Sequence, residues 1–453
     1  MATIDAIVDA GMDSLVSDLQ TLVRQPSVSA KNTGLVQCAN LVAGMMHKAG
    51  IRSEVLYLDD DDKSVPPIVY GEVRSKSNPK KTLLFYNHYD VQPEEPLELW
   101  DDEPFSAVVK DGKVFGRGSA DDKGELITRI KAVEYYLKAT GDAPCNVKFM
   151  VEGEEEIGSV HVEQYLEKYR EKLACDGVIW EFGYVDAKDR PIVSLGMKGL
   201  LYVELTAKGP SRDAHSSLAV LIENPAWRLV SALKALRDPS GRILVKDWYK
   251  DVRSFTKQEL AVIAKEPFDD KEFKQEYGIS KFVANARGVD VKKALVGMPT
   301  CNIAGFVSGY TGPGAKTVLP AEATVKIDFR LVPDMMPEKQ LARLRKYLKE
   351  KGFGDIEVRL IHGEAAARTP ISDPFVKKVE EAAKEAFGTV VLSVSAAGTG
   401  PMYSFVKVLK APCISVGSTH MFARIHSPNE FARIDLLNKC TKCIGRIMEK
   451  FAA

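Results

Sequence analysis

The sequence has no long apolar run: no stretch approaches the roughly 18 consecutive apolar residues that predict a membrane-spanning helix. Its first residues, MATIDAIVDAGMDSL, are acidic and lack the basic and then apolar segments of a secretory signal peptide. The sequence therefore predicts a soluble protein without a targeting segment, located in the cytoplasm.

The chain also has no net charge, because its 62 Lys and Arg residues are balanced by 62 Asp and Glu residues. This balance gives no electrostatic reason to expect nucleic acid or a membrane as a partner, which favours a small molecule. The seven cysteines are an odd number spread along the chain, unlike those of a disulfide-stapled secreted domain. One CxxC pair, Cys440 and Cys443, has no second pair, so no zinc site is expected there.

What the chain does contain is enough apolar material, 45% of 453 residues, for two domains. Over 67–182, strand-like runs such as TLLFYN and NVKFMVE alternate with helical ones, which predicts a mostly parallel or mixed sheet covered by helices. The pattern then changes to strand, helix, strand, strand, helix, strand, which is typical of a separate α+β domain. We therefore expect an α/β catalytic domain formed by 1–194 and 370–453, with the α+β domain inserted over 195–369.

Three segments have patterns that predict local structure. Residues 3–24 carry apolar side chains at helical spacing and predict one opening helix, which Pro26 ends. Residues 238–300 are polar and predict a long connection. Residues 323–332, ATVKIDFRLV, alternate as a strand with one wet face does. The side chains expected to face the core are Val325, Ile327, Phe329 and Leu331, and those expected on the other face are Lys326, Asp328 and Arg330.

Four apolar runs end in acidic residues or histidine. They are YNHYDVQP at 86–93, VFGRGSADDKG at 114–124, VKFMVEGEEEIGS at 147–159 and DGVIWEF at 176–182. In an open α/β sheet, function gathers outside the carboxyl ends of the strands, so these endings are expected to converge on one site. The candidate side chains are His88, Asp90, Asp121, Asp122, Glu152, Glu154, Glu155, Glu156 and Glu181.

So many carboxylates cannot share one cleft without cations, because burying an unpaired carboxylate is too costly. A mixed imidazole and carboxylate set suits zinc, with manganese or cobalt as alternatives. The number of acids suggests two ions about 3.5–4 Å apart, bridged by a carboxylate and a hydroxide. Each piece alone has an ordinary explanation as a cap, a turn or a solvated helix start, but their joint placement favours a metal centre.

Taken in order, eight motifs make the chain resemble the co-catalytic metallopeptidase superfamily: NHYDVQP, GRGSADDKG, EGEEEIGS, WEF, RDAHSS, GAKTVLP, FRLVP and IHSPNE. This superfamily includes carnosinases, Cys-Gly dipeptidases, aminoacylase, acetylornithine deacetylase and succinyl-diaminopimelate desuccinylase. The resemblance covers nearly the whole chain. It implies that the inserted domain is a lid and dimerisation domain and that the protein is a homodimer.

The resemblance also implies a set of metal ligands. His88 and Glu181 would hold one ion, Glu156 and His426 would hold the other, and Asp121 would bridge them. Many dipeptidases of the carnosinase type have aspartate at the position of Glu181. Glutamate preserves the charge and adds one methylene, so ligation should survive.

Two further acids have implied roles that are not ligation. Asp90 would hold the His88 ring in one tautomer, and Glu155 would be the general base that takes the proton from the bridging water. The resemblance implies a cis peptide bond after Asp121 as well.

In the inserted domain, the residues alone favour ordinary interpretations: His215 in RDAHSS is a surface-loop histidine, and Arg330 is an exposed cation. The resemblance instead implies that His215 donates to the oxyanion in the active site of the other subunit. Arg330 would clamp the terminal carboxylate of the substrate. The further substrate contacts that it implies are Asn302, Gly398, Thr399 and Gly400.

The motifs therefore predict a metallopeptidase that hydrolyses dipeptides or short peptides with a free C-terminal carboxylate. NHYDVQP and FRLVP are closer to the dipeptidase branch than to the deacylase branch, which has a shorter HTDVVP-like form. The alternative is an N-acyl-amino-acid deacylase of the acetylornithine deacetylase or desuccinylase type, and a minor alternative is a non-catalytic binding protein. No GxSxG motif occurs, so a serine nucleophile is not expected.

Overall fold

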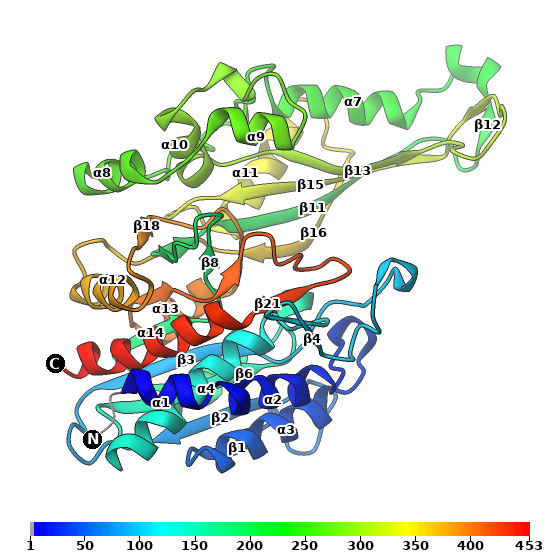
Figure 1. The fold of residues 1–453 in the computed structure, drawn as a ribbon. Helices are drawn as coiled ribbons and strands as arrows, with labels where there is room; N and C mark the ends of the chain where they lie inside the picture. Colours follow the sequence, from blue (N-terminus) through cyan, green and yellow to red (C-terminus); the bar gives the residue numbers. More distant parts are fainter. Residues whose placement is uncertain (1–3) are drawn as a thin grey trace. The chain divides into compact units, whose positions relative to one another are not determined.

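The structure, a computed structural model that describes residues 4–453, divides into two compact units. The first unit runs to Gly196 and resumes over Arg368–Val394 and Pro401–Ala453. The second unit comprises Met197–Ala367 and the short segment Ser395–Gly400. Each unit has its own core of buried apolar side chains, and Figure 1 shows the elements from which each is built.

An eight-stranded mixed sheet forms the middle of the first unit. Its spatial order is β1 (Arg52–Leu56), β2 (Ile68–Val73), β6 (Asn146–Glu152), β3 (Thr82–His88), β7 (Gly177–Trp180), β19 (Cys413–Ser415), β9 (Ile192–Ser194) and β18 (Val391–Ser393). The central strands β6, β3, β7 and β19 are parallel, whereas β1 and β2 pair antiparallel. The predicted mixed α/β sheet is confirmed.

Helices cover both faces of this sheet. The helices on one face are α1 (Ile4–Ala10), α2 (Met12–Val23), α3 (Leu35–Lys48), α4 (Lys123–Thr140), α12 (Pro374–Phe387) and α14 (Ile434–Ala452). The helices on the other are α5 (Val162–Lys168), α6 (Arg170–Leu173) and α13 (Met402–Leu409). There Phe405 of α13 packs its ring against Tyr86 and Trp180, with centroids 4.5 and 5.4 Å apart. Cys440 and Cys443, both on α14, are buried in the apolar core of the first unit.

Short strands complete the first unit. They are β4 (Val108–Lys110), β5 (Lys113–Phe115) and β21 (Phe431–Arg433), which form one small sheet, and β8 (Tyr184–Val185) and β20 (Thr419–His420), which pair in parallel. Where the chain passes between the units lie β10 (Gly196–Met197) and β17 (Ala367–Arg368). No helix among residues 4–453 is long and apolar enough to cross a membrane.

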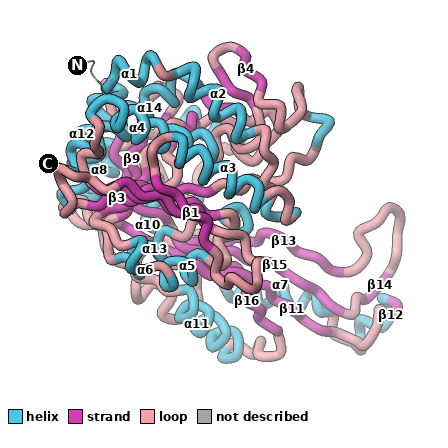
Figure 2. The backbone as a smooth tube through the Cα atoms, turned by 90° about the horizontal axis from the view of Figure 1, so that it is seen from below, coloured by secondary structure: helices cyan, strands magenta, loops and turns pink. Residues whose placement is uncertain are grey.

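The second unit is a four-stranded antiparallel sheet. Its order is β13 (Asn302–Ser308), β15 (Glu322–Leu331), β11 (Gly199–Lys208) and β16 (Glu357–Glu364). Two helices, α7 (Pro225–Leu236) and α11 (Pro337–Glu350), pack on one face through a shared apolar core. At one end of the long strands lie β12 (Ala214–His215) and β14 (Val318–Leu319), which Figure 2 also shows.

The alternation predicted for 323–332 is confirmed. Val325, Ile327, Phe329 and Leu331 are all fully buried on the helix side of β15, where they pack with the α7 and α11 side chains. The intervening polar side chains lie on the opposite face, where Arg330 is half-buried.

Two local predictions were wrong. The opening helix is two helices, because Gly11 separates α1 from α2 and the ring of Tyr135 fills the space that a Cβ of Gly11 would occupy. The 238–300 connection contains α8 (Lys257–Lys265), α9 (Asp270–Glu276) and α10 (Val289–Gly297). These helices are short and bury few side chains, and the capping box of Thr256 and Glu259 was the available signal for the start of α8.

Candidate metal centre

The strand order brings the predicted acidic endings to one edge of the first sheet. Strands β6, β3 and β7 are parallel neighbours, so their carboxyl ends lie together. His88 is the last residue of β3 and pairs in register with Glu152, the last residue of β6. Glu181 directly follows β7. Asp121 lies just before α4, and Glu156 lies in the short helix Glu155–Ile157.

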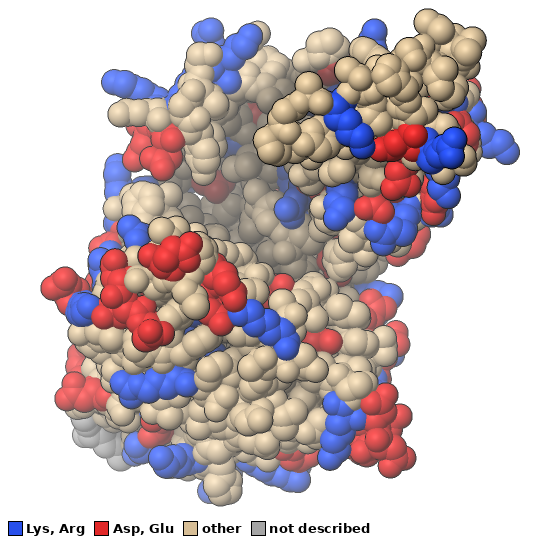
Figure 3. Space-filling model, turned by 90° about the vertical axis from the view of Figure 1, so that its right-hand side faces the viewer, with Lys and Arg blue, Asp and Glu red and all other residues tan. Residues whose placement is uncertain are grey.

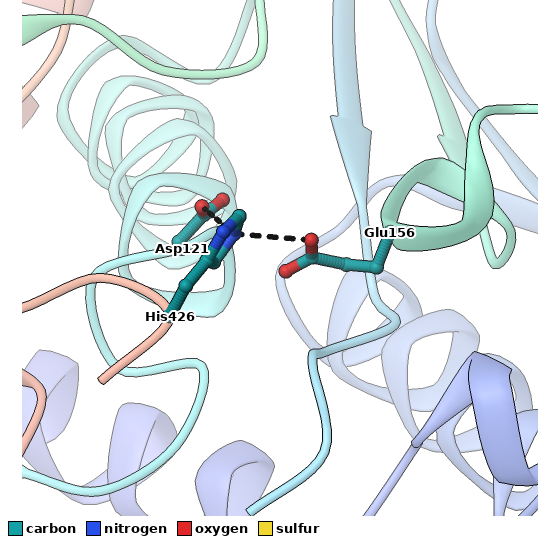
Figure 4. Close-up of side chains that lie close together, drawn as sticks. All are labelled: Asp121, Glu156 and His426. Atoms are coloured by element: carbon teal, nitrogen blue, oxygen red, sulfur yellow. Dashed lines mark ion pairs between the residues drawn. The ribbon is translucent and has the colours of Figure 1, made fainter. Parts of the chain in front are cut away.

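Asp121 and Glu156 form a compact group with a third residue, His426, as drawn in Figure 4. The Nε2 atom of His426 lies 3.2 Å from Oδ2 of Asp121 and 3.1 Å from Oε2 of Glu156. The ligand atoms of the three residues all lie within 4.8 Å of one another, as the ligands of one metal ion would. His426 comes from the loop that leads to β21, about 300 residues after Asp121 in the chain.

His88 lies on the other side of the same carboxylate. Its Nε2 atom is 3.1 Å from Oδ1 of Asp121, so each oxygen of Asp121 faces one imidazole. Its Nδ1 atom is 3.1 Å from the backbone oxygen of Asp90 and 3.4 Å from the carboxylate of Asp90. The peptide bond between Asp121 and Asp122 is cis.

Asp90 also contacts a second part of the site. Its two carboxylate oxygens accept hydrogen bonds from the backbone N–H groups of Glu155, at 3.2 Å, and Glu156, at 3.0 Å. Because Asp90 is fully buried, these hydrogen bonds are shielded from water, which strengthens them. The structure thus connects Asp90 to the predicted general base as well as to His88.

Burial disfavours the ionised form of the two remaining acids, Glu155 and Glu181, when no cation is bound beside them. It raises the pKa of the Glu181 carboxyl well above its usual range, and the charge of Glu155 adds to the shift. Burial likewise raises the pKa of Glu155 well above its usual range. Glu181 accepts one hydrogen bond, from the Trp180 indole at 3.1 Å, and its buried Oε2 has no partner.

The imidazoles of His88 and His426 lower the pKa of the Asp121 carboxyl that lies between them, whereas burial raises it. Burial opposes ionisation of Asp121, but hydrogen bonds from His426 and His88 outweigh it and hold its pKa below the usual range. In return, the hydrogen bond to Asp121, followed by that to Glu156, raises the pKa of His426 to about 10. The group therefore attracts positive charge strongly.

The donor set fits divalent metal ions. Among the residues that the structure describes, no Lys or Arg side chain forms a hydrogen bond or ion pair with Asp121, Glu155, Glu156 or Glu181. Carboxylates buried this closely need a compensating cation, and Glu181 Oε2 has an unused lone pair. His88, Asp121, Glu156, Glu181 and His426 together offer the imidazole and carboxylate ligands that zinc and related metals prefer.

Sequence reasoning gave no role to two amides in YNHYDVQP. The Gln92 side chain donates to Oε2 of Glu156 at 2.9 Å. The Asn87 side chain donates to the carboxylate of Asp122 at 2.8 Å and to the backbone oxygen of Glu181 at 3.1 Å. Both hold acidic segments of the site in place. Asn87 adjoins His88 in the buried strand β3, and Gln92 follows His88 by four residues, and this proximity in the sequence was the available signal.

The predicted substrate contacts of the second unit also lie together. The guanidinium of Arg330 donates to the hydroxyl of Thr399 at 2.7 Å, and the backbone oxygen of Gly398 accepts from the N–H of Lys198 at 3.0 Å. Asn302 lies opposite Asp328 in the sheet and donates to its carboxylate at 2.7 Å. The cluster leaves Arg330 partly exposed, with 36% of its side chain accessible.

His215 lies elsewhere in the second unit. It is exposed in β12, and its Nδ1 atom is 2.8 Å from the hydroxyl of Ser217. Nδ1 also accepts a hydrogen bond from the Ser217 backbone N–H at 3.2 Å. Nε2 has no hydrogen-bond partner within the described chain, so this nitrogen is free to donate to a group from outside.

A centre of this kind, at the carboxyl edge of an α/β sheet with a carboxylate beside it, serves metal-assisted hydrolysis. The same chemistry is found in the proteins that this chain resembles. A model of peptidase family M20/M25/M40 matches residues 84–450, so the chain belongs to this family and is a metallopeptidase.

Three relatives show the extent of the similarity. The chain is 33% identical to the Cys-Gly metallodipeptidase of Schizosaccharomyces pombe over 77% of its own length and 75% of that protein. It is 31% identical to the human Beta-Ala-His dipeptidase over 63% of its length and 57% of that protein. A solved M20 family metallo-carboxypeptidase of Sulfolobus solfataricus covers 97% of this chain and 99% of its own, with 37% identity and a TM-score of 0.90.

Proposed function

We propose that the protein hydrolyses the amide bond of dipeptides or short peptides that have a free C-terminal carboxylate. The observation that carries this proposal is the Asp121 carboxylate held between His88 and His426, with Glu155 nearby and uncommitted. Family membership supports peptide hydrolysis, and the relatives named as dipeptidases and as a carboxypeptidase support short substrates of this kind.

The chain's residues divide the chemistry between them. His88 and Glu181 would hold one divalent ion, Glu156 and His426 the other, with Asp121 shared between the two. When bound, such ions polarise a scissile carbonyl and make a water molecule acidic enough to lose its proton near neutral pH. Zinc suits the mixed donor set best, and manganese or cobalt are alternatives.

Glu155 is assigned the proton transfers. Its carboxylate takes a proton from the attacking water, and then gives it to the nitrogen of the leaving amine as the C–N bond breaks. The two backbone N–H groups held by Asp90 fix the Glu155–Glu156 turn from which this side chain extends. The side chain of Glu155 forms no hydrogen bond or ion pair in the described chain, so its carboxylate is available to take up this proton.

The second unit is proposed to be an inserted lid that binds substrate. Arg330, with its planar fork of donors, suits the terminal carboxylate of a peptide, and Thr399 orients it. Asn302, Gly398 and Gly400 are proposed as further contacts. His215 is proposed to donate from the partner subunit to the oxyanion that forms at the carbonyl.

A panel of substrates tests this function. We expect chromatographic separation of the products to show release of free amino acids from dipeptides such as Cys-Gly or β-Ala-His, and no release of acetate from N-acetyl amino acids. The matched control is the same dipeptide with a C-terminal amide. Its kcat/KM should fall about 10- to 100-fold, because a charge-assisted hydrogen bond contributes roughly 1.5–3 kcal/mol. Faster hydrolysis of N-acetyl amino acids would instead assign the protein to the deacylases.

We further propose that the protein is a cytoplasmic homodimer. All seven cysteines are free, which fits a reducing compartment. On the face drawn in Figure 3, charged side chains of both signs are present, and a group of acidic ones lies at the left of the view. The dimer interface would include β13, which is an edge of the second sheet and, within residues 4–453, pairs with β15 alone. Such an unpaired edge is suited to pairing with another chain. The large apolar side chains exposed on β13 are Ile303, Phe306 and Val307.

Changing this edge should give monomers. Val307 is 67% exposed. We expect Val307→Lys to shift the mass found by light scattering from two chains to one, because charge on an edge strand opposes pairing. Turnover should fall with it, since His215 would lose its site in the partner. Leu360→Lys on β16, the opposite edge, is the matched control and should remain dimeric. A dimeric Val307→Lys variant would show that the interface lies elsewhere.

A further inference from the structure

A buried ion pair in the first unit lies outside the predicted ligand set. The guanidinium Nη1 of Arg117 is 2.7 Å from Oε2 of Glu430, and the two side chains are only 2% and 1% exposed. Removing two charges from water is costly, and such a pair is stable only if further hydrogen bonds satisfy it. The partners of each group show what the pair holds together.

The Glu430 carboxylate binds the backbone of one short segment. Oε2 also accepts from the N–H of Gly118 at 3.1 Å. Oε1 accepts from the N–H of Ala120 at 3.0 Å and from the N–H of Asp121 itself at 3.1 Å. Together with Arg117, four donors from 117–121 converge on one carboxylate. They fix the backbone of this segment up to Asp121, the residue that faces both imidazoles.

Glu430 also belongs to the loop that carries His426. It follows His426 by four residues, and its backbone oxygen accepts from the N–H of Gly116 at 2.9 Å. The segments bearing Asp121 and His426 are therefore joined by the backbone and by the side chain of the same residue. The distance between the Asp121 and His426 side chains depends on this connection.

Arg117 extends the connection to a third segment. One of its nitrogens donates to the backbone oxygen of Pro93 at 3.1 Å, and Pro93 lies five residues after His88. Its other terminal nitrogen approaches the backbone oxygen of Ser427, next to His426, at 3.4 Å. The pair thus touches the segments of three ligands, which a pair that merely stabilised the core would not need to do.

We propose that Glu430 is a positioning residue of the metal centre, which together with Arg117 fixes the Asp121 carboxylate relative to His426. It does not touch the metal ions or the substrate; it acts through the backbone amide of Asp121. The inference rests on the proposed function only in placing metal ions at Asp121. It adds a determinant of metal affinity that lies in GRGSADDKG and IHSPNE but is not itself a ligand.

The substitution Glu430→Gln tests this role in the full-length protein. Glutamine has one acceptor oxygen and an NH₂ group that cannot accept from Arg117 or the amides, so part of the connection is lost. We expect the affinity of the metal-free protein for Zn²⁺, measured by competition with a chromophoric chelator, to fall about 10- to 100-fold, as is typical when a group that orients a ligand is removed. The visible absorption of the Co²⁺-substituted protein should also change, because the ligand geometry changes.

A matched control separates positioning from general stability. Glu134 is a largely buried acid of α4 that pairs with Lys131 and Lys138, away from the centre. Glu134→Gln should lower the melting temperature without weakening Zn²⁺ binding or altering the Co²⁺ spectrum. If the Glu430→Gln protein binds Zn²⁺ as tightly as the unaltered protein, or no more weakly than Glu134→Gln, the proposal is wrong.

A second variant keeps the test decisive if Glu430→Gln does not fold. Arg117→Lys retains the positive charge, but a single ammonium cannot replace the guanidinium fork that reaches Glu430 and Pro93 together. We expect a smaller loss of Zn²⁺ affinity in this variant, and unchanged affinity would overturn the proposal. Because these titrations need no substrate, their outcome is independent of whether dipeptides are hydrolysed.

Discussion

Replacing Glu155 by glutamine should lower kcat for dipeptide hydrolysis by about 10²- to 10⁴-fold, the usual contribution of a general base, while both metal ions stay bound. Glutamine has nearly the same shape as glutamate but cannot take up the proton of the attacking water. The Glu155 carboxylate forms no side-chain hydrogen bond or ion pair in the described chain, so its loss leaves no partner unsatisfied. The measurement is steady-state kinetics together with metal analysis of the same sample.

The adjacent acid provides a matched control for this substitution. Glu154 is also buried, but its carboxylate pairs with His161 at 2.8 Å rather than with the ligand cluster. Glu154→Gln should therefore keep kcat within a few-fold of the unaltered protein. A Glu155→Gln enzyme with undiminished kcat would remove Glu155 from its role, and a variant that loses metal would make Glu155 a ligand instead of a base.

The fold could be predicted from sequence where a pattern is local and repeated. The alternation of Val325, Ile327, Phe329 and Leu331 places a strand with one buried face, because side chains alternate strictly along a strand. The convergence of acidic endings followed from a general rule about parallel strands rather than from any distance in the sequence. The order β6-β3-β7, which makes His88 and Glu181 neighbours, could not be read from the chain itself.

The candidate site was harder to predict from the sequence, because its contacts join segments that are distant in the chain and lie in loops. His426 has no periodic pattern around it, and only the resemblance pointed to it, although it forms one compact group with Asp121 and Glu156. The Asp90 carboxylate accepts hydrogen bonds from the backbone amides of Glu155 and Glu156, and a backbone donor cannot be recognised from the type of side chain at its position. Helices α8 to α10 have only seven to nine residues each, so an apolar pattern can repeat over little more than two turns.

The last prediction concerns how many metal ions each ligand holds. If Asp121 bridges two ions, the variant Asp121→Asn should lose both, because an amide offers one neutral acceptor in place of two charged oxygens. His88→Ala and His426→Ala should each lose a single ion, since these imidazoles lie on opposite oxygens of Asp121, at 3.1 and 3.2 Å. The measurement is equilibrium dialysis against Zn²⁺ followed by elemental analysis, which gives ions per chain.

Asp90→Ala is the comparison that distinguishes ligands from residues that orient them. Asp90 contacts the His88 ring and the Glu155 and Glu156 amides but not the other cluster side chains, so both ions should bind, about 10- to 100-fold more weakly. In each of the three ligand variants, turnover should fall on the order of 10³-fold, which corresponds to several kcal/mol of lost transition-state stabilisation. An Asp121→Asn protein that retains one ion at full affinity would show that the carboxylate is a ligand of a single ion, and the centre would then have no bridge.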